Sequence, residues 1–180
     1  MAILQVAYLG RPVLREVAGK IKKNEIENPE FQSFLDDLLQ SMLFHDGVGL
    51  AAPQVFNSTR VVAVWVPPEM DDAKGEGIEP TVFINPELHD SSKEMVNGWE
   101  GCLSLRDLRG IVPRHEAVTL RALDRNGTKV EKRIEGFMAR VLQHEVDHLD
   151  GVLFPDRMQD LSSLGFEKDL VAGQDSTGEE

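Results

Sequence analysis

The chain has 180 residues, 41% hydrophobic and 28% charged, and this composition predicts one globular domain that buries its core without disulfides, because Cys102 is the only cysteine. Its formal net charge of −12 argues against a phosphate backbone as the main ligand, since nucleic-acid-binding domains usually carry a basic stripe. The N-terminus shows no leader-like pattern and no long apolar run, so we expect no membrane insertion and a cytoplasmic protein, or an organelle-lumen protein from which a leader has been removed.

The first predicted helix follows Asn28. Apolar residues recur at the three-and-four spacing of one helical face: Phe31, Phe34, Leu35, Leu38, Leu39, Met42 and Leu43. Asn28 can cap the first turn and Pro29 suits the first helical position, while Gly47 lies just past the end. These signals predict an amphipathic helix that begins at Pro29 and ends before Gly47.

Two short strands are predicted after this helix. The sequences RVVAVWV at residues 60–66 and TVFIN at residues 81–85 are rich in β-branched and aromatic side chains. The segment between them, residues 67–80, is rich in proline, glycine and acidic residues, which predicts a surface loop within one domain.

The remaining predicted elements are a hairpin and a second helix. Residues 117–134 alternate on both sides of Asn126-Gly127, a strong hairpin signal, and a helix is predicted over residues 137–149. Without regular βαβ alternation, this order indicates an α+β fold. We expect a catalytic domain over residues 1–170 and a disordered acidic tail over residues 171–180, whose composition cannot bury a core.

The second helix carries the sequence QHEVDHLDG at residues 143–151. His144 and His148 are one turn apart on one face, so their imidazoles can converge on a single ion. Glu145 is offset by about 100°, too far to be an equal ligand but near enough to reach a water on the metal. Two apolar residues precede the histidines on the same side and place the pair against the interior: Phe137 and Val141.

A catalytic site of this kind needs a third protein ligand and an open position. A zincin peptidase would take that ligand from downstream, and Glu167 is the candidate, because Phe154 stands where one zincin branch has its last histidine. Cys102 is the other candidate, although a lone cysteine is most often a small core residue. A closed structural metal module without activity would instead need a fourth protein ligand, and Glu145 would then have no water to act on.

Three motifs resemble those of peptide deformylase. They are GVGLAAPQ at residues 47–54, EGCLS at residues 100–104 and QHEVDHLDG at residues 143–151, in the family's order and at similar separations. LGRPVLREVA at residues 9–18 is similar to the segment that opens the family's fold. The resemblance covers about residues 5–165 and implies a single α+β domain of short, mostly antiparallel strands packed around a central metal-binding helix.

The resemblance also implies a metal centre. Its ligands would be Cys102, His144 and His148, holding one Fe(2+) ion per chain, for which Zn(2+), Ni(2+) or Co(2+) can substitute. Affinity order alone would favour zinc over iron. An ion with these ligands lowers the pKa of its water towards neutrality, and the resulting hydroxide would attack the formyl carbonyl. Glu145 would be the general acid–base.

The implied substrates are N-formylmethionyl nascent peptides, met near the ribosome exit in the bacterial cytoplasm. The Gln54 side-chain amide and the Leu103 backbone N–H would donate to the oxyanion formed during attack, and Gly49 would lie beside the substrate. Three apolar residues are candidates for the wall of a methionine pocket: Val48, Phe137 and Val141.

The chain departs from the family pattern after EGCLS. Leu105 is followed by Arg106, where the family commonly has proline, so the fixed φ of proline is lost and a charge stands at the expected rim of the cleft. Arg109 and Arg114 occupy positions that are arginine in many relatives. For Arg114, pairing with Asp147 and solvation at the surface are both open alternatives.

Overall fold

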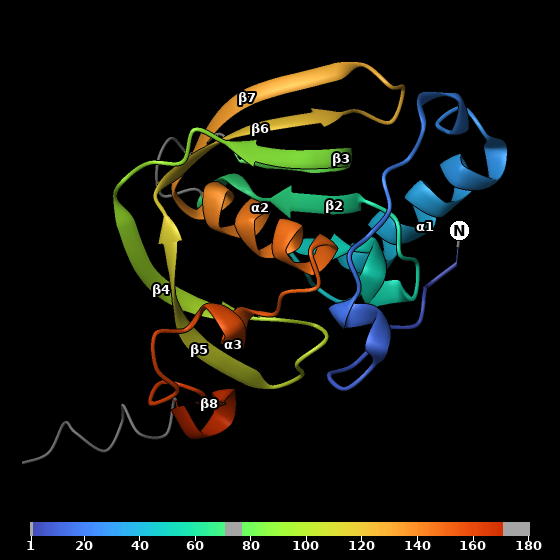
Figure 1. Cartoon of the computed structure of the whole chain (residues 1–180). Helices are drawn as coiled ribbons and strands as arrows, with labels where there is room; N and C mark the ends of the chain where they lie inside the picture. Colours follow the sequence, from blue (N-terminus) through green and yellow to red (C-terminus); the bar gives the residue numbers. More distant parts are fainter. Residues whose placement is uncertain (1, 71–76, 171–180) are drawn as a thin grey trace, which may run out of the picture.

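Two antiparallel sheets lie on either side of a central helix (Figure 1). The computed structural model describes residues 2–70 and 77–170. The larger sheet has the order β1-β2-β3-β6-β7 and is built from β1 (Gly49–Ala51), β2 (Val61–Val66), β3 (Ile78–His89), β6 (Ala117–Leu123) and β7 (Lys129–Glu135). The smaller sheet has the order β4-β5-β8 and is built from β4 (Met95–Gly101), β5 (Leu108–His115) and β8 (Gly165–Phe166).

The helices are few, which confirms the expected α+β class. The labelled α-helices are α1 (Pro29–Phe44), α2 (Gly136–Leu149) and α3 (Phe154–Arg157), and residues 167–170 are also helical. The 3-10 helices are η1 (Pro12–Arg15), η2 (Lys23–Glu25), η3 (Ala52–Val55) and η4 (Pro68–Met70). Among the described residues, no helix is long and apolar enough to cross a bilayer.

Local signals located α1 and the hairpin correctly. Asn28 accepts a hydrogen bond from the Glu30 backbone N–H at 2.8 Å and so caps α1, as predicted. Gly127 has φ 76° in the turn between β6 and β7, a conformation that glycine adopts at no steric cost. The predicted loop was partly wrong, because β3 already begins at Ile78. Residues 71–76 of that loop and the predicted tail at residues 171–180 lie outside the described residues.

Helix α2 is held between the sheets by its apolar side chains. Eleven of its fourteen residues are buried. Leu142 and Leu149 are inaccessible to solvent and pack with Val62, Val64 and Val118 of the larger sheet. Each such side chain contributes roughly 1.5–3 kcal/mol to the free energy of unfolding. This packing fixes the rotation of α2, so that its remaining polar face is turned towards the smaller sheet.

Candidate metal centre

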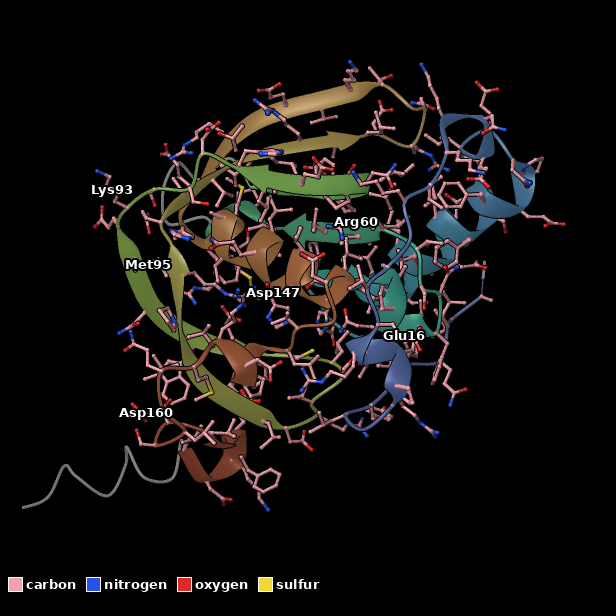
Figure 2. The ribbon with its side chains drawn as sticks, in the orientation of Figure 1. Glu16, Arg60, Lys93, Met95, Asp147 and Asp160 are labelled. Atoms are coloured by element: carbon pink, nitrogen blue, oxygen red, sulfur yellow. The ribbon has the colours of Figure 1, made fainter. Side chains whose placement is uncertain are left out.

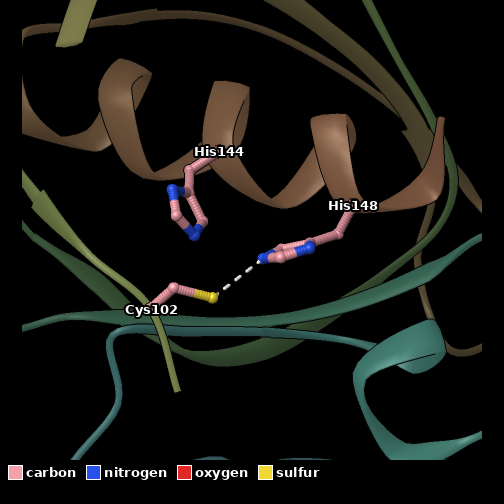
Figure 3. A group of neighbouring side chains, drawn as sticks. All are labelled: Cys102, His144 and His148. Atoms are coloured by element: carbon pink, nitrogen blue, oxygen red, sulfur yellow. Dashed lines mark hydrogen bonds between the residues drawn. The ribbon is translucent and has the colours of Figure 1, made fainter. Parts of the chain in front are cut away.

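His144, His148 and Cys102 converge in the interior although they come from two different elements. The two histidines lie one turn apart on α2, with ring centroids 4.9 Å apart, and Cys102 directly follows the end of β4. Figure 3 shows the three side chains pointing toward one another, with Cys102 Sγ 3.2 Å from His148 Nε2. The three ligand atoms all lie within 4.8 Å of one another, which is the spacing that one ion requires.

The chemistry of these three side chains fits a divalent cation. Burial alone would raise the pKa of the Cys102 thiol, but His148 and His144 outweigh it and hold that pKa well below its ordinary value. Burial would lower the pKa of His144, yet contacts with Cys102 and Glu100 raise it well above its ordinary value. The cluster therefore favours a thiolate and attracts positive charge. One thiolate with two imidazoles suits zinc, cobalt, nickel or ferrous iron.

Glu100 orients the first histidine. Its Oε2 accepts a hydrogen bond from His144 Nδ1 at 2.9 Å, which leaves Nε2 as the free ligand atom. Arg114 binds the same carboxylate through Nε at 2.9 Å and Nη2 at 3.0 Å. Burial would raise the pKa of Glu100, but the hydrogen bonds from His144 and Arg114 outweigh it and lower the pKa to about 2. Glu100 is thus a carboxylate that fixes the tautomer of His144.

The pairing of Arg114 with Asp147 is now established. The two side chains are buried, and Arg114 Nη1 lies 2.5 Å from Asp147 Oδ2. Asp147 also accepts a bond from Arg157 Nη2 at 2.6 Å. Asp147 lies in the interior, whereas Lys93 and Asp160 lie at the surface (Figure 2). Surface solvation of Arg114 is therefore excluded, and an ionic chain runs from Arg157 to His144.

Sequence reasoning missed Glu100 as a functional residue, although a signal was present. A histidine that binds a metal usually donates its other ring N–H to a carboxylate or a carbonyl. Glu100 stands two residues before Cys102, and residues two apart in an extended chain face the same side. The first letter of EGCLS could therefore have been assigned to the support of the metal centre.

Glu145 is a buried carboxyl group beside the three ligand residues. Its side chain is 4% exposed, and Oε2 has no hydrogen-bond partner among the described residues. Burial is the main cause that raises its pKa to about 7. Gly49 leaves room for it, because a Cβ at this position would lie 2.2 Å from Glu145 Oε1. A carboxyl group that titrates near neutrality can both accept and return a proton.

Gln54 and Leu103 place hydrogen-bond donors near Cys102. Gln54 Oε1 accepts from the Ala51 N–H at 2.8 Å, which turns Nε2 towards Ser104 Oγ at 3.2 Å and Cys102 Sγ at 3.4 Å. The backbone N–H of Leu103 makes no hydrogen bond to another described residue. The Gln54 amide is thus held by the backbone of Ala51, and the Leu103 N–H is a free donor among the described residues.

The other predicted site residues have varied positions. Val48 and Phe137 are partly buried against the cluster that contains Val141, which is itself buried. Arg106 is exposed. Glu167 is about half exposed and pairs with Arg109 at 2.8 Å, so it is not part of the metal-binding group. Within the described residues, that group also contains no fourth ligand.

A model of the polypeptide deformylase family matches residues 3–163 of the chain. The chain belongs to the polypeptide deformylase family. Peptide deformylase 2 of a Nostoc species is 41% identical over 157 residues, covering 87% of each chain. Peptide deformylase 1 of Prochlorococcus marinus is 42% identical over 171 residues, covering 94% of this chain and 88% of the relative.

Solved structures of polypeptide deformylases have the same fold. A class I type b peptide deformylase from Acinetobacter baumannii, with Met-Ala-Ser bound, has a TM-score of 0.80 and 40% identity, covering 87% of this chain and 99% of that one. Peptide deformylase from Thermotoga maritima has a TM-score of 0.76 and 33% identity, covering 89% of this chain and all of that one. The resemblance seen in the three motifs is confirmed, and the chain is an enzyme of the family that deformylates nascent peptides.

Proposed function

We propose that this polypeptide deformylase acts on N-formylmethionyl nascent peptides through the centre formed by Cys102, His144 and His148. The observation that carries the proposal is the convergence of these ligand atoms beside the buried, partly unpartnered carboxyl group of Glu145. A divalent ion at the centre would supply Lewis-acid activation of water. Fe(2+) is the proposed resident ion, with Zn(2+), Ni(2+) or Co(2+) as substitutes.

Glu145 is the proposed proton carrier. In the reaction, a water oxygen forms a bond to the formyl carbon, and the bond between that carbon and the methionine nitrogen breaks. Glu145 accepts the proton that water releases and delivers it to the departing amine, so that formate and a free amino group result. Its burial supports this role, because a carboxyl group with a pKa of about 7 exchanges protons readily at neutral pH.

The developing negative charge on the formyl oxygen needs fixed donors. We assign this role to Gln54 Nε2 and the Leu103 backbone N–H, because preorganised donors stabilise an oxyanion without reorganising. The hydrogen bond from the Ala51 N–H fixes the orientation of the Gln54 amide, which supports this assignment.

The methionine side chain would contact an apolar wall beside the centre. We propose that Gly49 lies along the substrate and that three residues form the wall: Val48, Phe137 and Val141. Their shared hydrophobic cluster supports this assignment. The relative crystallised with Met-Ala-Ser supports a short peptide that begins with methionine as the ligand.

We further propose that the reaction takes place near the ribosome exit in the bacterial cytoplasm. Residues 1–170 are the proposed catalytic domain, followed by an acidic tail at residues 171–180.

The direct test of the proposed function is release of formate from formyl-Met-Ala-Ser by the purified full-length chain. Formate should accumulate together with intact Met-Ala-Ser, as measured by a coupled formate assay and mass spectrometry. Met-Ala-Ser without the formyl group is the control substrate and should remain unchanged. Cleavage of either peptide bond without formate release would indicate a peptidase.

The iron and zinc forms of the enzyme are expected to differ in turnover and in stability in air. Apoprotein reconstituted anaerobically with Fe(2+) is expected to turn over formyl-Met-Ala faster than the zinc form and to lose activity in air, because ferrous iron and the Cys102 thiolate are both oxidisable. Turnover per bound ion, measured before and after exposure to air, checks this expectation. Equal activity and equal stability of the two forms in air would contradict the assignment of iron.

Gln54→Leu should lower kcat far more than it changes peptide affinity. The lost amide would meet a charge that exists only in the transition state, and removing such a donor raises the barrier by about 3 kcal/mol. Steady-state kinetics with metal content measured in parallel provides the test, because Gln54 also contacts Cys102. A change confined to KM would exclude the oxyanion role.

A further inference from the structure

The Arg140 side chain extends from α2 to Glu100 and to the backbone of the smaller sheet. Arg140 Nη1 lies 2.9 Å from Glu100 Oε1 and 2.8 Å from the Val112 carbonyl oxygen, and Nη2 donates to the Val96 carbonyl oxygen at 2.6 Å. The side chain is only 11% exposed. Arg140 stands one helical turn before His144, so both residues lie on the face of α2 that is turned towards Glu100.

Gly98 provides the space that this guanidinium occupies. A Cβ at residue 98 would lie 2.8 Å from both Cζ and Nη2 of Arg140, closer than such atoms approach in proteins. Gly98 and Glu100 are two residues apart on β4. The missing side chain therefore lets Arg140 cross the strand and reach the carboxylate.

Arg140 completes the set of hydrogen bonds around Glu100. Oε1 accepts from Arg114 Nε and Arg140 Nη1, while Oε2 accepts from Arg114 Nη2 and His144 Nδ1. A carboxylate offers about four acceptor positions, so none is left for water. The two arginines join α2 and the smaller sheet from opposite sides. Arg114 belongs to β5 and binds Asp147 of α2, whereas Arg140 belongs to α2 and binds carbonyl groups of β4 and β5.

We propose that Arg140 is a positioning residue of the metal centre. From α2 it binds both Glu100 and the backbone of β4 and β5, and it thereby orients His144. The inference rests on the proposed function for its catalytic consequence but not for its effect on metal binding. Glu100 belongs to β4 and Arg114 to β5, so without Arg140 the links from Glu100 to α2 among the described residues would be His144 itself and, through Arg114, Asp147. With Arg140 present, the His144 ring is held relative to the strand that ends at Cys102, so the distance between two ligands is fixed.

The test compares Arg140→Ala with a matched control, Arg60→Ala. Arg60 is as buried as Arg140, pairs with Asp150 at 2.5 Å and donates to the Pro86 carbonyl oxygen at 3.2 Å, but it does not contact Glu100. Losing an outer partner of a metal ligand typically costs 10- to 100-fold in metal affinity. We expect that loss, measured with Zn(2+) and a competing chelator, in Arg140→Ala and not in Arg60→Ala, although both variants should have lower Tm values.

Kinetics on the metal-saturated variants adds a second measurement. Arg140→Ala should lower kcat about tenfold and change KM less than twofold, because His144 is displaced while the peptide contacts remain. Arg140→Lys should recover part of the metal affinity, since it keeps the charge but not the forked geometry. Wild-type metal affinity and kcat in Arg140→Ala, or equal metal loss in Arg60→Ala, would overturn the proposal.

Gly98 allows an independent test of the same geometry. Gly98→Ala should weaken metal binding in the wild-type background, because the new methyl group displaces the Arg140 guanidinium. In the Arg140→Ala background the same substitution should have little further effect. Additive losses would overturn the proposed route through Glu100. If wild-type protein releases no formate, the proposed function fails, but the metal affinities still decide the role of Arg140.

Discussion

Cys102→Ser is expected to lose its metal and its deformylase activity together. A serine hydroxyl stays protonated near pH 7, whereas the surroundings of Cys102 hold the thiol pKa well below its ordinary value and favour the thiolate that binds metal. With one of three ligands lost, His144 and His148 would have to share the ion with an additional water. Metal content after gel filtration and formate release from formyl-Met-Ala measure the two losses.

Glu167→Ala is the matched control for this substitution. Glu167 pairs with Arg109 at the surface, so its loss should leave both the metal content and the activity almost unchanged. The opposite pattern, with metal lost from the Glu167 variant and retained in the Cys102 variant, would indicate a zincin-like site. It would also contradict the assignment of Cys102 as a ligand.

Glu145→Gln is expected to keep its metal and to lose activity by a factor of about 10² to 10⁴. Glutamine has nearly the same shape as glutamate but cannot accept the proton that water releases. Metal analysis and kcat measured on the same preparation separate the two effects. Nearly full turnover with metal bound would show that another group transfers the proton.

Glu145→Gln should also raise the free energy of unfolding of the metal-free protein at alkaline pH. The folded-state pKa of Glu145 is raised from 4.5 to about 7, so between these values the folded state holds a proton that the unfolded state has lost. Its contribution to the free energy of unfolding therefore falls as pH rises through this window, and the total loss is on the order of 3 kcal/mol once the pH exceeds 7. Chemical unfolding of the two apoproteins should give a clear difference at pH 8 and little difference at pH 4.

Elements with strong local signals were predictable from the sequence. The Asn28 cap and Pro29 mark the start of α1, and Asn126-Gly127 marks the turn of the β6–β7 hairpin. The smaller sheet was not predicted, because β4 and β5 contain residues that are rare in strands. Gly98 lies in β4 and Pro113 lies in β5, so local propensity does not favour extended structure there. These strands are stabilised by pairing with each other, and β5 also packs against α2 and α3.

Some residues of the candidate site could likewise be predicted from the sequence, and others could not. His144, Glu145 and His148 belong to one helix, so helical periodicity alone brings them together. Cys102 was assigned only through resemblance, because no local pattern connects it to residues more than forty positions away. The contact of Glu100 with Arg114 depends on the pairing of β4 with β5, which was not predicted, and its contact with Arg140 depends on how the smaller sheet packs against α2. Charged residues in a sequence are also usually read as surface residues.

An ion bound by the three ligands would also cross-link two parts of the chain that are distant in sequence. Cys102 and His148 are 46 residues apart, and Cys102 directly follows β4 of the smaller sheet while His148 belongs to the helix packed on the larger one. An ion held by both is a cross-link that closes a long loop of chain, and a covalent cross-link of this span reduces unfolded-state entropy by the equivalent of about 4 kcal/mol. Removing the ion should therefore loosen the attachment of the β4–β5 hairpin to the rest of the fold, so that proteolytic cutting of this hairpin becomes faster in the apoprotein.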